Sequence, residues 1–452
     1  MEPQIDIRNV YEHVNHVGQL TNSIHDLDLD SEGILPFCAQ NLIHIDDVDI
    51  NSSHTLYLYN ISTFGKIHTS LGLDSNQTKS LFSNISDKVI SYSKSIKNFY
   101  ILIYFGFENE LDKFHINKLY LDSIQYNIPR NKIIILSNNF GIEDNINRYK
   151  SKYKIKNSKD FLCIIYNLHM LYKGNELIDS QTVDLFLKED DIISYKKNKL
   201  LFLNRRLHPH RILMLCLLAE SNNIENNLIS FDMNYTNTDY FIDYIKTHNY
   251  LGLDEYSEPN EIIKNIIKSN DMLKITKGYD ILTKINKKSL DIENYESIEG
   301  RSLEVDDVSL YKDSYFSLVS ETEFFTKWNI YTTEKTIKPI QQYHPFVILG
   351  NPNTLKYLQS MGFQTFSSVW DESYDNEIID SVRIFKVSKL VNSLIKKTDD
   401  EWVDILKKIK PILIHNRELL KKYSANNNIF NIEQTIYKNL TDESIQNYQK
   451  LF

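Results

Sequence analysis

The sequence predicts an α/β fold in two domains, followed by a helical segment. Two series of short apolar runs alternate with helical stretches, and a charged segment separates the two series. Beyond them the pattern is helical only. The 452 residues suffice for two domains of ordinary size, and alternating strands and helices are typical of parallel sheets covered by helices.

The first series lies in the N-terminal half of the chain. Runs rich in β-branched and aromatic residues predict strands at 54–61, 98–107, 132–136 and 161–166. A helix is expected at 112–126, ended by Pro129, between the second and third runs. Strand, helix and strand at this spacing predict a βαβ unit and therefore a parallel sheet.

The second series follows the charged segment 188–199. It predicts strands and helices in alternation, with strands at 200–203, 227–231, 315–319, 345–349 and 362–366, and helices at 209–220, 333–342 and 354–360. Residues 240–300 are expected to form a helical insertion. Two such series predict two Rossmann-like domains that face a central cleft, because ligands of these folds bind at the carboxyl ends of strands.

The predicted domain bounds follow from these changes of pattern. We expect an N-terminal domain at 1–195, a C-terminal domain at 196–385, and a helical segment at 386–452 that packs across both. Apolar residues at helical spacing after Arg383 support the last of these.

Composition limits the class of function. The formal net charge of -9 argues against a surface that coats nucleic acid, so no nucleic-acid partner is expected. The three cysteines show no CxxC spacing, which indicates neither a zinc site nor a disulfide framework. We find no signal peptide and no apolar run of about 18 residues, and expect a cytoplasmic protein without a membrane span. Heavy use of Asn, Ile, Lys and Tyr indicates an AT-rich coding sequence, as in viruses and low-GC bacteria.

The segment from Tyr315 to Asp375 carries the clearest chemistry. A buried strand would deliver Ser320 and Glu321 to its carboxyl end, and the next helix would open near Thr333. Thr333 suits an N-cap, and the free N–H groups with Lys335 would attract a diphosphate. The ligand-binding residues predicted from these features are Glu321, Thr333, Glu334 and Lys335. The structural alternative is that Glu334 and Lys335 are solvated charges of a first helical turn.

A second cluster lies between a predicted strand and a predicted helix. Residues 204–211 bring three arginines and two histidines to a helix N-terminus, where fixed positive charge would stabilise a departing nucleoside diphosphate without a divalent ion. The candidates for this role are Arg205 and Arg211, which follow Asn204 at the end of the predicted strand. The other interpretation is a basic surface loop that pairs with local acids.

These residues resemble a known motif. An apolar strand, Ser-Glu, Tyr-x-Thr-Glu-Lys at 331–335 and an apolar strand ending at Gly350 resemble the donor-binding motif of the family 10 α-1,3-fucosyltransferases. They are more loosely similar to exostosin-type and viral or phage glycosyltransferase-like proteins. Thr322 stands where the fucosyltransferases commonly have Asn. The resemblance implies a GT-B fold whose C-terminal domain binds a nucleotide sugar without a metal, and transfer with inversion. It also implies that Tyr331 faces the donor, and that Asn204 and Arg211 match an Asn at a strand end and the Arg that follows it in the fucosyltransferases.

The expected function is therefore glycosyl transfer. The donor would be a GDP-sugar or UDP-sugar carrying fucose or another hexose, the acceptor a hydroxyl of a glycan or another molecule, and no cofactor or metal is expected. Asp47-Val48-Asp49 fits a divalent-ion motif, but such short matches are common in a chain with 60 acidic residues. Two alternatives stay open: transfer to a modified nucleobase in DNA, and a catalytically silent carbohydrate-binding or assembly protein.

The N-terminal domain is expected to bind the acceptor. Glu108 follows the strand predicted at 98–107 and would serve there as the general base. Glu110 and Asp112 compete for this role, and an exposed turn carboxylate is the structural alternative. The sequence leaves the oligomeric state open.

Overall fold

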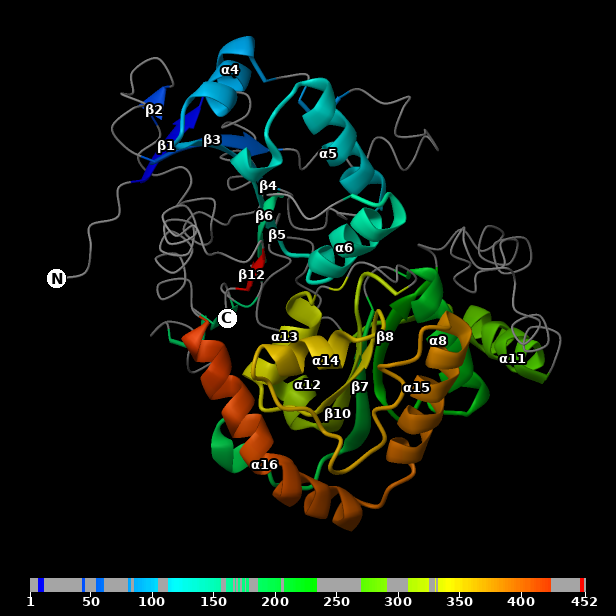
Figure 1. Ribbon diagram of the computed structural model, residues 1–452. Helices are drawn as coiled ribbons and strands as arrows, with labels where there is room; N and C mark the ends of the chain where they lie inside the picture. Colours follow the sequence, from blue (N-terminus) through cyan, green and yellow to red (C-terminus); the bar gives the residue numbers. More distant parts are fainter. Residues whose placement is uncertain are drawn as a thin grey trace. The chain divides into compact units, whose positions relative to one another are not determined.

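The computed structural model describes residues 7–11, 43–44, 54–60, 80–82, 85–104, 113–155, 160–165, 167, 170, 173–174, 176–178, 186–204, 207–233, 270–290, 308–324, 330, 332–423 and 448–450. Contacts between residues divide the chain into two compact units (Figure 1). The first unit comprises Met1–Asn175 with Tyr423–Phe452, and the second comprises Glu176–Lys422. The second unit is therefore one continuous stretch, whereas the first is built from both ends of the chain.

These bounds differ from the domain bounds expected from sequence. The second unit begins at Glu176, before the charged segment. It contains the helices α15 (Asp380–Ile395) and α16 (Asp399–Lys422), and only the residues after α16 return to the first unit.

The first unit is built on a seven-stranded parallel sheet. Its order is β12-β6-β5-β4-β3-β1-β2. The strands are β1 (Ile7–Tyr11), β2 (Ile43–His44), β3 (His54–Asn60), β4 (Phe99–Tyr104), β5 (Ile133–Ser137), β6 (Leu162–Ile165) and β12 (Tyr448–Lys450). The four strands predicted in this half, and the parallel pairing, are confirmed. All five residues of β5 are buried, as expected of a parallel strand covered on both faces.

The helices described in the first unit alternate with strands β3 to β6 along the chain. They are α4 (Asp87–Ser95), α5 (Lys113–Gln125) and α6 (Ile142–Lys152), with a short 3-10 helix η1 (Arg130–Lys132) before β5. The Ser86 hydroxyl caps α4 by accepting from the Val89 N–H at 3.3 Å. Helix α5 confirms the helix expected at 112–126, and it ends before Asn127, whose φ of 52° belongs to the left-handed region.

The second unit is built on a five-stranded sheet in the order β11-β10-β7-β8-β9. The strands are β7 (Asn198–Leu203), β8 (Leu228–Asp232), β9 (Lys287–Lys288), β10 (Ser314–Ser320) and β11 (Phe346–Leu349). All pair in parallel except β9, which runs antiparallel to β8. Every residue of β10 is buried, so this central strand carries the core of the unit.

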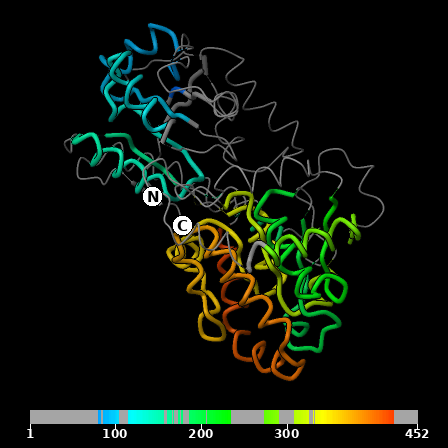
Figure 2. The backbone as a smooth tube through the Cα atoms, turned by 90° about the vertical axis from the view of Figure 1, so that its right-hand side faces the viewer, coloured from blue at the N-terminus to red at the C-terminus, as the bar shows by residue number. Residues whose placement is uncertain are grey.

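Helices cover both faces of this sheet. Along the chain come η3 (Glu189–Asp191), α8 (Pro209–Glu220), α11 (Asn270–Ile285), α12 (Val308–Lys312), α13 (Glu334–Gln341), α14 (Thr354–Ser360), α15 and α16. Helix α8 packs against α11 and α15, and α13 packs against α16. Figure 2 shows α8 in green and α11 in yellow-green side by side from a second direction. The helices that follow β7 and β10 thus cover opposite faces.

The strand predicted at 362–366 is wrong, because this segment consists of turns and irregular chain. Burial alternates along it, with Phe363 buried between two exposed residues, which imitates a strand. Side chains bind its backbone in place of a neighbouring strand: Gln364 N–H donates to Asn416 Oδ1 at 2.8 Å and Phe366 N–H to Glu372 Oε1 at 2.7 Å. Gly362 adds a φ of +91°, which no strand contains.

His344 is a buried histidine that holds β10 to its neighbours. Its Nε2–H donates to the Ser314 carbonyl at 2.9 Å, which fixes the neutral tautomer, so Nδ1 accepts from the Ser317 hydroxyl at 2.9 Å. Burial lowers the pKa of His344 from 6.5 to about 3. The folded protein therefore keeps this imidazole neutral at every pH at which an unfolded chain would begin to protonate it.

We expect this histidine to make the protein less stable in mild acid. Below pH 6.5 the His344 imidazole binds a proton in the unfolded state, whereas in the folded state it stays neutral down to about pH 3. The contribution of His344 to stability is therefore complete above pH 6.5 and decreases as the pH is lowered. By pH 5 the loss should reach about 2 kcal/mol. Urea unfolding of wild type and His344→Gln at pH 7 and pH 5 measures it, with the exposed His415→Gln as control. An equal loss in all three proteins would contradict the assignment.

Candidate functional site

The two clusters expected from sequence meet at adjoining strand ends. The chain runs from β7 to β8 on one side and from β10 to β11 on the other, so the direction of winding changes between β7 and β10. Ligands of open α/β sheets bind at such a switch point, outside the carboxyl ends of the strands. Leu201 pairs with Ser317, and three further residues along both strands bring Asn204 level with Ser320. Asn204 and Glu321 therefore lie at the same edge.

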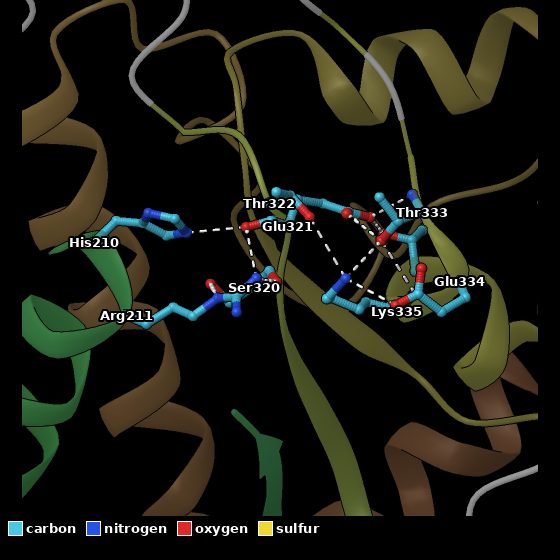
Figure 3. A network of polar contacts seen from close by, with 9 residues as sticks. His210, Arg211, Ser320, Glu321, Thr322, Thr333, Glu334 and Lys335 are labelled. Atoms are coloured by element: carbon cyan, nitrogen blue, oxygen red, sulfur yellow. Dashed lines mark hydrogen bonds and ion pairs between the residues drawn. The ribbon is translucent and has the colours of Figure 1, made fainter. Parts of the chain in front are cut away.

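Glu321 is buried and fixes the start of α13. It is 2 % exposed, and its Oε1 accepts from the Thr333 N–H at 3.1 Å and from the Thr336 hydroxyl. Its Oε2 accepts from the Thr333 hydroxyl at 2.6 Å. Figure 3 shows the carboxylate directed at Thr333. A carboxylate at a helix N-terminus satisfies free N–H groups and complements the helix dipole, so Glu321 positions α13 on the end of β10.

Thr333 is the N-cap of α13, as predicted. Its hydroxyl oxygen accepts from the Lys335 N–H at 3.3 Å, and its backbone is extended. The Glu321 and Thr333 side chains thus form one connected network that begins in β10 and ends in the first turn of the helix. The network explains why the Ser-Glu and Thr-Glu-Lys segments occur together in this chain.

Lys335 carries the part-exposed positive charge of this network. Its Nζ lies 2.8 Å from Glu334 Oε1, 3.3 Å from the Thr333 hydroxyl and 3.5 Å from the Thr322 hydroxyl (Figure 3). The Lys335 side chain is 32 % exposed and that of Glu334 is 18 % exposed, so neither is a freely solvated surface charge. An anion that approaches α13 would compete with Glu334 for the ammonium group.

Arg211 and His210 turn from α8 towards the end of β10. Arg211 is 3 % exposed, its Nε donates to the Ser320 hydroxyl at 3.3 Å, and its Nη2 donates to the Ser320 and Glu321 carbonyls at 3.2 and 3.3 Å. His210 Nε2–H donates to the same Glu321 carbonyl at 2.9 Å. Burial, aided by the nearby Arg211 charge, lowers the pKa of His210 well below its usual value. These contacts give both residues a positioning role.

Arg383 is a further residue of this site, and the sequence analysis did not identify it. It is buried on α15, and its guanidinium lies 4.2 Å over the Phe324 ring, against which His210 also stacks. Its Nε donates to the Gly350 carbonyl at 3.0 Å, and Nη2 donates to the Phe324 carbonyl at 2.6 Å. One side chain therefore joins the segments that follow β10 and β11. Helical spacing could have indicated that Arg383 is buried, because it lies on the same face of α15 as the buried Val387 and Val391.

The acidic segment 371–375 caps a helix. Asp375 Oδ1 accepts from the Leu355 N–H at 2.8 Å and Oδ2 from the Lys356 N–H at 3.1 Å, which satisfies the first turn of α14. Burial raises the pKa of Asp375. Asp375 therefore caps a helix that precedes it in the chain.

Several predicted residues lie outside the described part of the chain. These are Glu108, Arg205 and Tyr331, together with Glu110, Asp112, Asp47 and Asp49. Where the structure does describe the chain, no group of three or more His, Cys, Asp or Glu side chains is arranged to hold a metal ion. Over the same residues, no helix has the length and apolar character needed to cross a membrane.

No protein-family model matches the chain, and no curated protein sequence matches it at a significant level.

Proposed function

We propose that the protein is a GT-B glycosyltransferase that moves fucose or another hexose from a GDP-sugar or UDP-sugar to a hydroxyl of a glycan or another acceptor. One observation carries the proposal. Arg211 and Glu321, 110 positions apart in sequence, bond to each other at the switch point between β7 and β10. The two segments that resemble a nucleotide-sugar site are thus neighbours where α/β folds bind their ligands.

The topology of the second unit supports a nucleotide ligand. Numbered within the unit, its strands lie in the order 5-4-1-2-3, which matches five of the six strands of a doubly wound dinucleotide-binding sheet (3-2-1-4-5-6), apart from the antiparallel third strand. Two compact units, each with a mainly parallel sheet, agree with a GT-B architecture. The first unit would supply the acceptor site.

The described contacts suggest separate roles for the residues in ligand binding and in positioning. Lys335 and the α13 N-terminus would bind the diphosphate and stabilise the charge that develops on it as the sugar leaves, so a metal ion is not required. Glu321, Arg211 and Arg383 would hold the two strand ends and α13 in place. In this proposal Glu108 removes the proton from the acceptor hydroxyl, and attack from the opposite face of the sugar inverts its anomeric carbon.

A thermal-shift screen tests the donor site. We expect one of GDP, UDP, CDP, ADP or their sugar conjugates to stabilise the protein in the presence of EDTA, by about 2.7 kcal/mol at about 100 times its Kd. Lys335→Ala should weaken binding about 10- to 100-fold, because it removes a charge-assisted hydrogen bond to phosphate. Lys407→Ala is the matched control, because Lys407 also pairs with a neighbouring carboxylate, that of Asp404, but lies on α16.

The other functions predict different results. If no nucleotide stabilises the wild-type protein, the donor site is wrong and a silent carbohydrate-binding or assembly protein explains the fold better. Stabilisation without release of nucleoside diphosphate in the presence of any acceptor also indicates a silent protein. Release that requires DNA with hydroxyl-bearing bases, but not a glycan, would assign the acceptor to the modified nucleobase.

A further inference from the structure

Asn204 has an unusual environment at the end of β7. It is 3 % exposed, its Nδ2 donates to the Ser230 carbonyl at 3.3 Å, and its backbone N–H donates to the Ser230 hydroxyl at 3.1 Å. The Phe202 carbonyl is the second acceptor near Nδ2, at 3.5 Å. Two carbonyl oxygens therefore face the amide nitrogen, and the reversed orientation would set oxygen against oxygen. The orientation of the amide is fixed, with Oδ1 on the other side.

The Asn204 Oδ1 is buried and accepts no hydrogen bond from the part of the chain that the structure describes. Buried polar atoms in folded proteins nearly always have a partner, so an unmatched oxygen requires an explanation. This oxygen lies at the carboxyl edge, level with Ser320 and before the N-terminus of α8, where a ligand is expected. A ligand hydroxyl that supplies the missing hydrogen would explain why this oxygen at the carboxyl edge lacks a donor in the described protein.

We propose that Asn204 binds a sugar hydroxyl of the nucleotide-sugar ligand, with Oδ1 as the acceptor, an inference that rests on the proposed function. The diphosphate cannot fill this place, because its oxygens carry no proton at neutral pH. Strands β7 and β10 are neighbours about 4.8 Å apart, so Asn204 is close to the phosphate position near Lys335. Hydroxyls of the ribose and of the transferred sugar flank a diphosphate, whereas the donor groups of the base lie farther away.

Asn227 supplies a matched control for this proposal. It is also a buried asparagine of the second unit, at 4 % exposure, but its amide is satisfied on both sides. Its Oδ1 accepts from the Leu200 N–H at 2.9 Å and its Nδ2 donates to the Asn223 carbonyl at 3.0 Å. Asn227→Ala should therefore lower stability without changing ligand affinity. Asn204→Ala should lower ligand affinity, because it removes the unmatched oxygen, and it should also lower stability somewhat, because the Nδ2 bonds to the Ser230 and Phe202 carbonyls are lost.

Calorimetric titration of the full chain tests the proposal. The ligands are the nucleoside diphosphate identified by the thermal screen, its 2′-deoxy and 3′-deoxy forms, and its sugar conjugate. If Asn204 binds the ribose, one deoxy form should bind wild type about tenfold more weakly than the parent, and Asn204→Ala should bind both equally. If it binds the transferred sugar, Asn204→Ala should weaken only the conjugate, by about tenfold.

Other outcomes overturn the proposal. Equal affinity of Asn204→Ala and wild type for every ligand would remove Asn204 from the site while leaving the proposed function intact. The same follows if deoxy forms lose the same factor in both proteins and the conjugate is unaffected. The deoxy series on unaltered protein does not depend on the variant's folding, and equal binding of all forms there excludes the ribose. No binding of any nucleotide to wild type would overturn both proposals.

Discussion

Replacing Arg383 with Met should lower the free energy of unfolding by about 3–5 kcal/mol. Arg383 is 1 % exposed, and its Nη2 forms an ion pair with Asp380 Oδ1 at 2.6 Å. Three further N–H groups bond to the carbonyls of Gly350, Phe324 and Glu377. Met fills a similar volume but leaves the Asp380 carboxylate buried without its cation and three carbonyls without their donor.

Urea unfolding at pH 7 measures this effect. The control is Lys389→Met, which makes the same kind of change at an exposed position of α15 and should alter stability by less than about 0.5 kcal/mol. Adding Asp380→Asn to Arg383→Met should recover part of the loss, since it removes the uncompensated charge. A loss below about 1 kcal/mol in Arg383→Met would contradict the conclusion that Arg383 joins the segments that follow β10 and β11.

Gly278→Ala should destabilise the second unit by about 2–3 kcal/mol. Gly278 lies within α11, where it faces the backbone of α8. A Cβ there would overlap the Cys216 carbonyl oxygen and lie 2.7 Å from the Cys216 Cα. Backbone atoms of a buried helix cannot turn aside as a side chain can, so α11 would have to move away from α8.

The sign of this effect is diagnostic. In an exposed helix the same change stabilises by about 0.5–1 kcal/mol, because alanine loses less conformational entropy than glycine on folding. The urea midpoint should fall for Gly278→Ala, whereas the neighbouring exposed Lys277→Ala should keep the midpoint of the wild type. A raised midpoint for Gly278→Ala would show that α8 and α11 do not approach this closely in solution.

The sequence located β3, β4, β5 and β6 of the first sheet and β7, β8, β10 and β11 of the second, because runs such as 132–136 are apolar and have clear ends. It did not predict β1, β2, β9 or β12. It failed at 362–366, where alternating burial arises from packing against α16 and not from a ladder. Partners far apart in sequence explain the other gaps. Pattern placed Glu321 at a strand end but could not show that Thr333 and Thr336 occupy its carboxylate.

Arg383 and Asn204 also have contacts that the sequence did not show: the sequence analysis missed Arg383 and selected Asn204. Arg383 looked like the beginning of a helical region, although its side chain joins segments that precede it in the chain by 33 and 59 positions. Asn204 was selected for its place after a strand, but only the structure reveals that one side of its amide is matched and the other is not. The hydrogen-bond partners of such polar groups are visible only in the three-dimensional structure.

The route of the chain through the two units determines how they respond to force. The second unit is inserted in the first, and β12, near the C-terminus, is held at the edge of the first sheet by its pairing with β6. When the chain is pulled by its ends, tension passes through the ladder between β12 and β6 and bypasses the residues from Glu176 to Lys422. The ladder between β12 and β6 is therefore expected to yield before any load reaches the second unit, which contains the candidate ligand site.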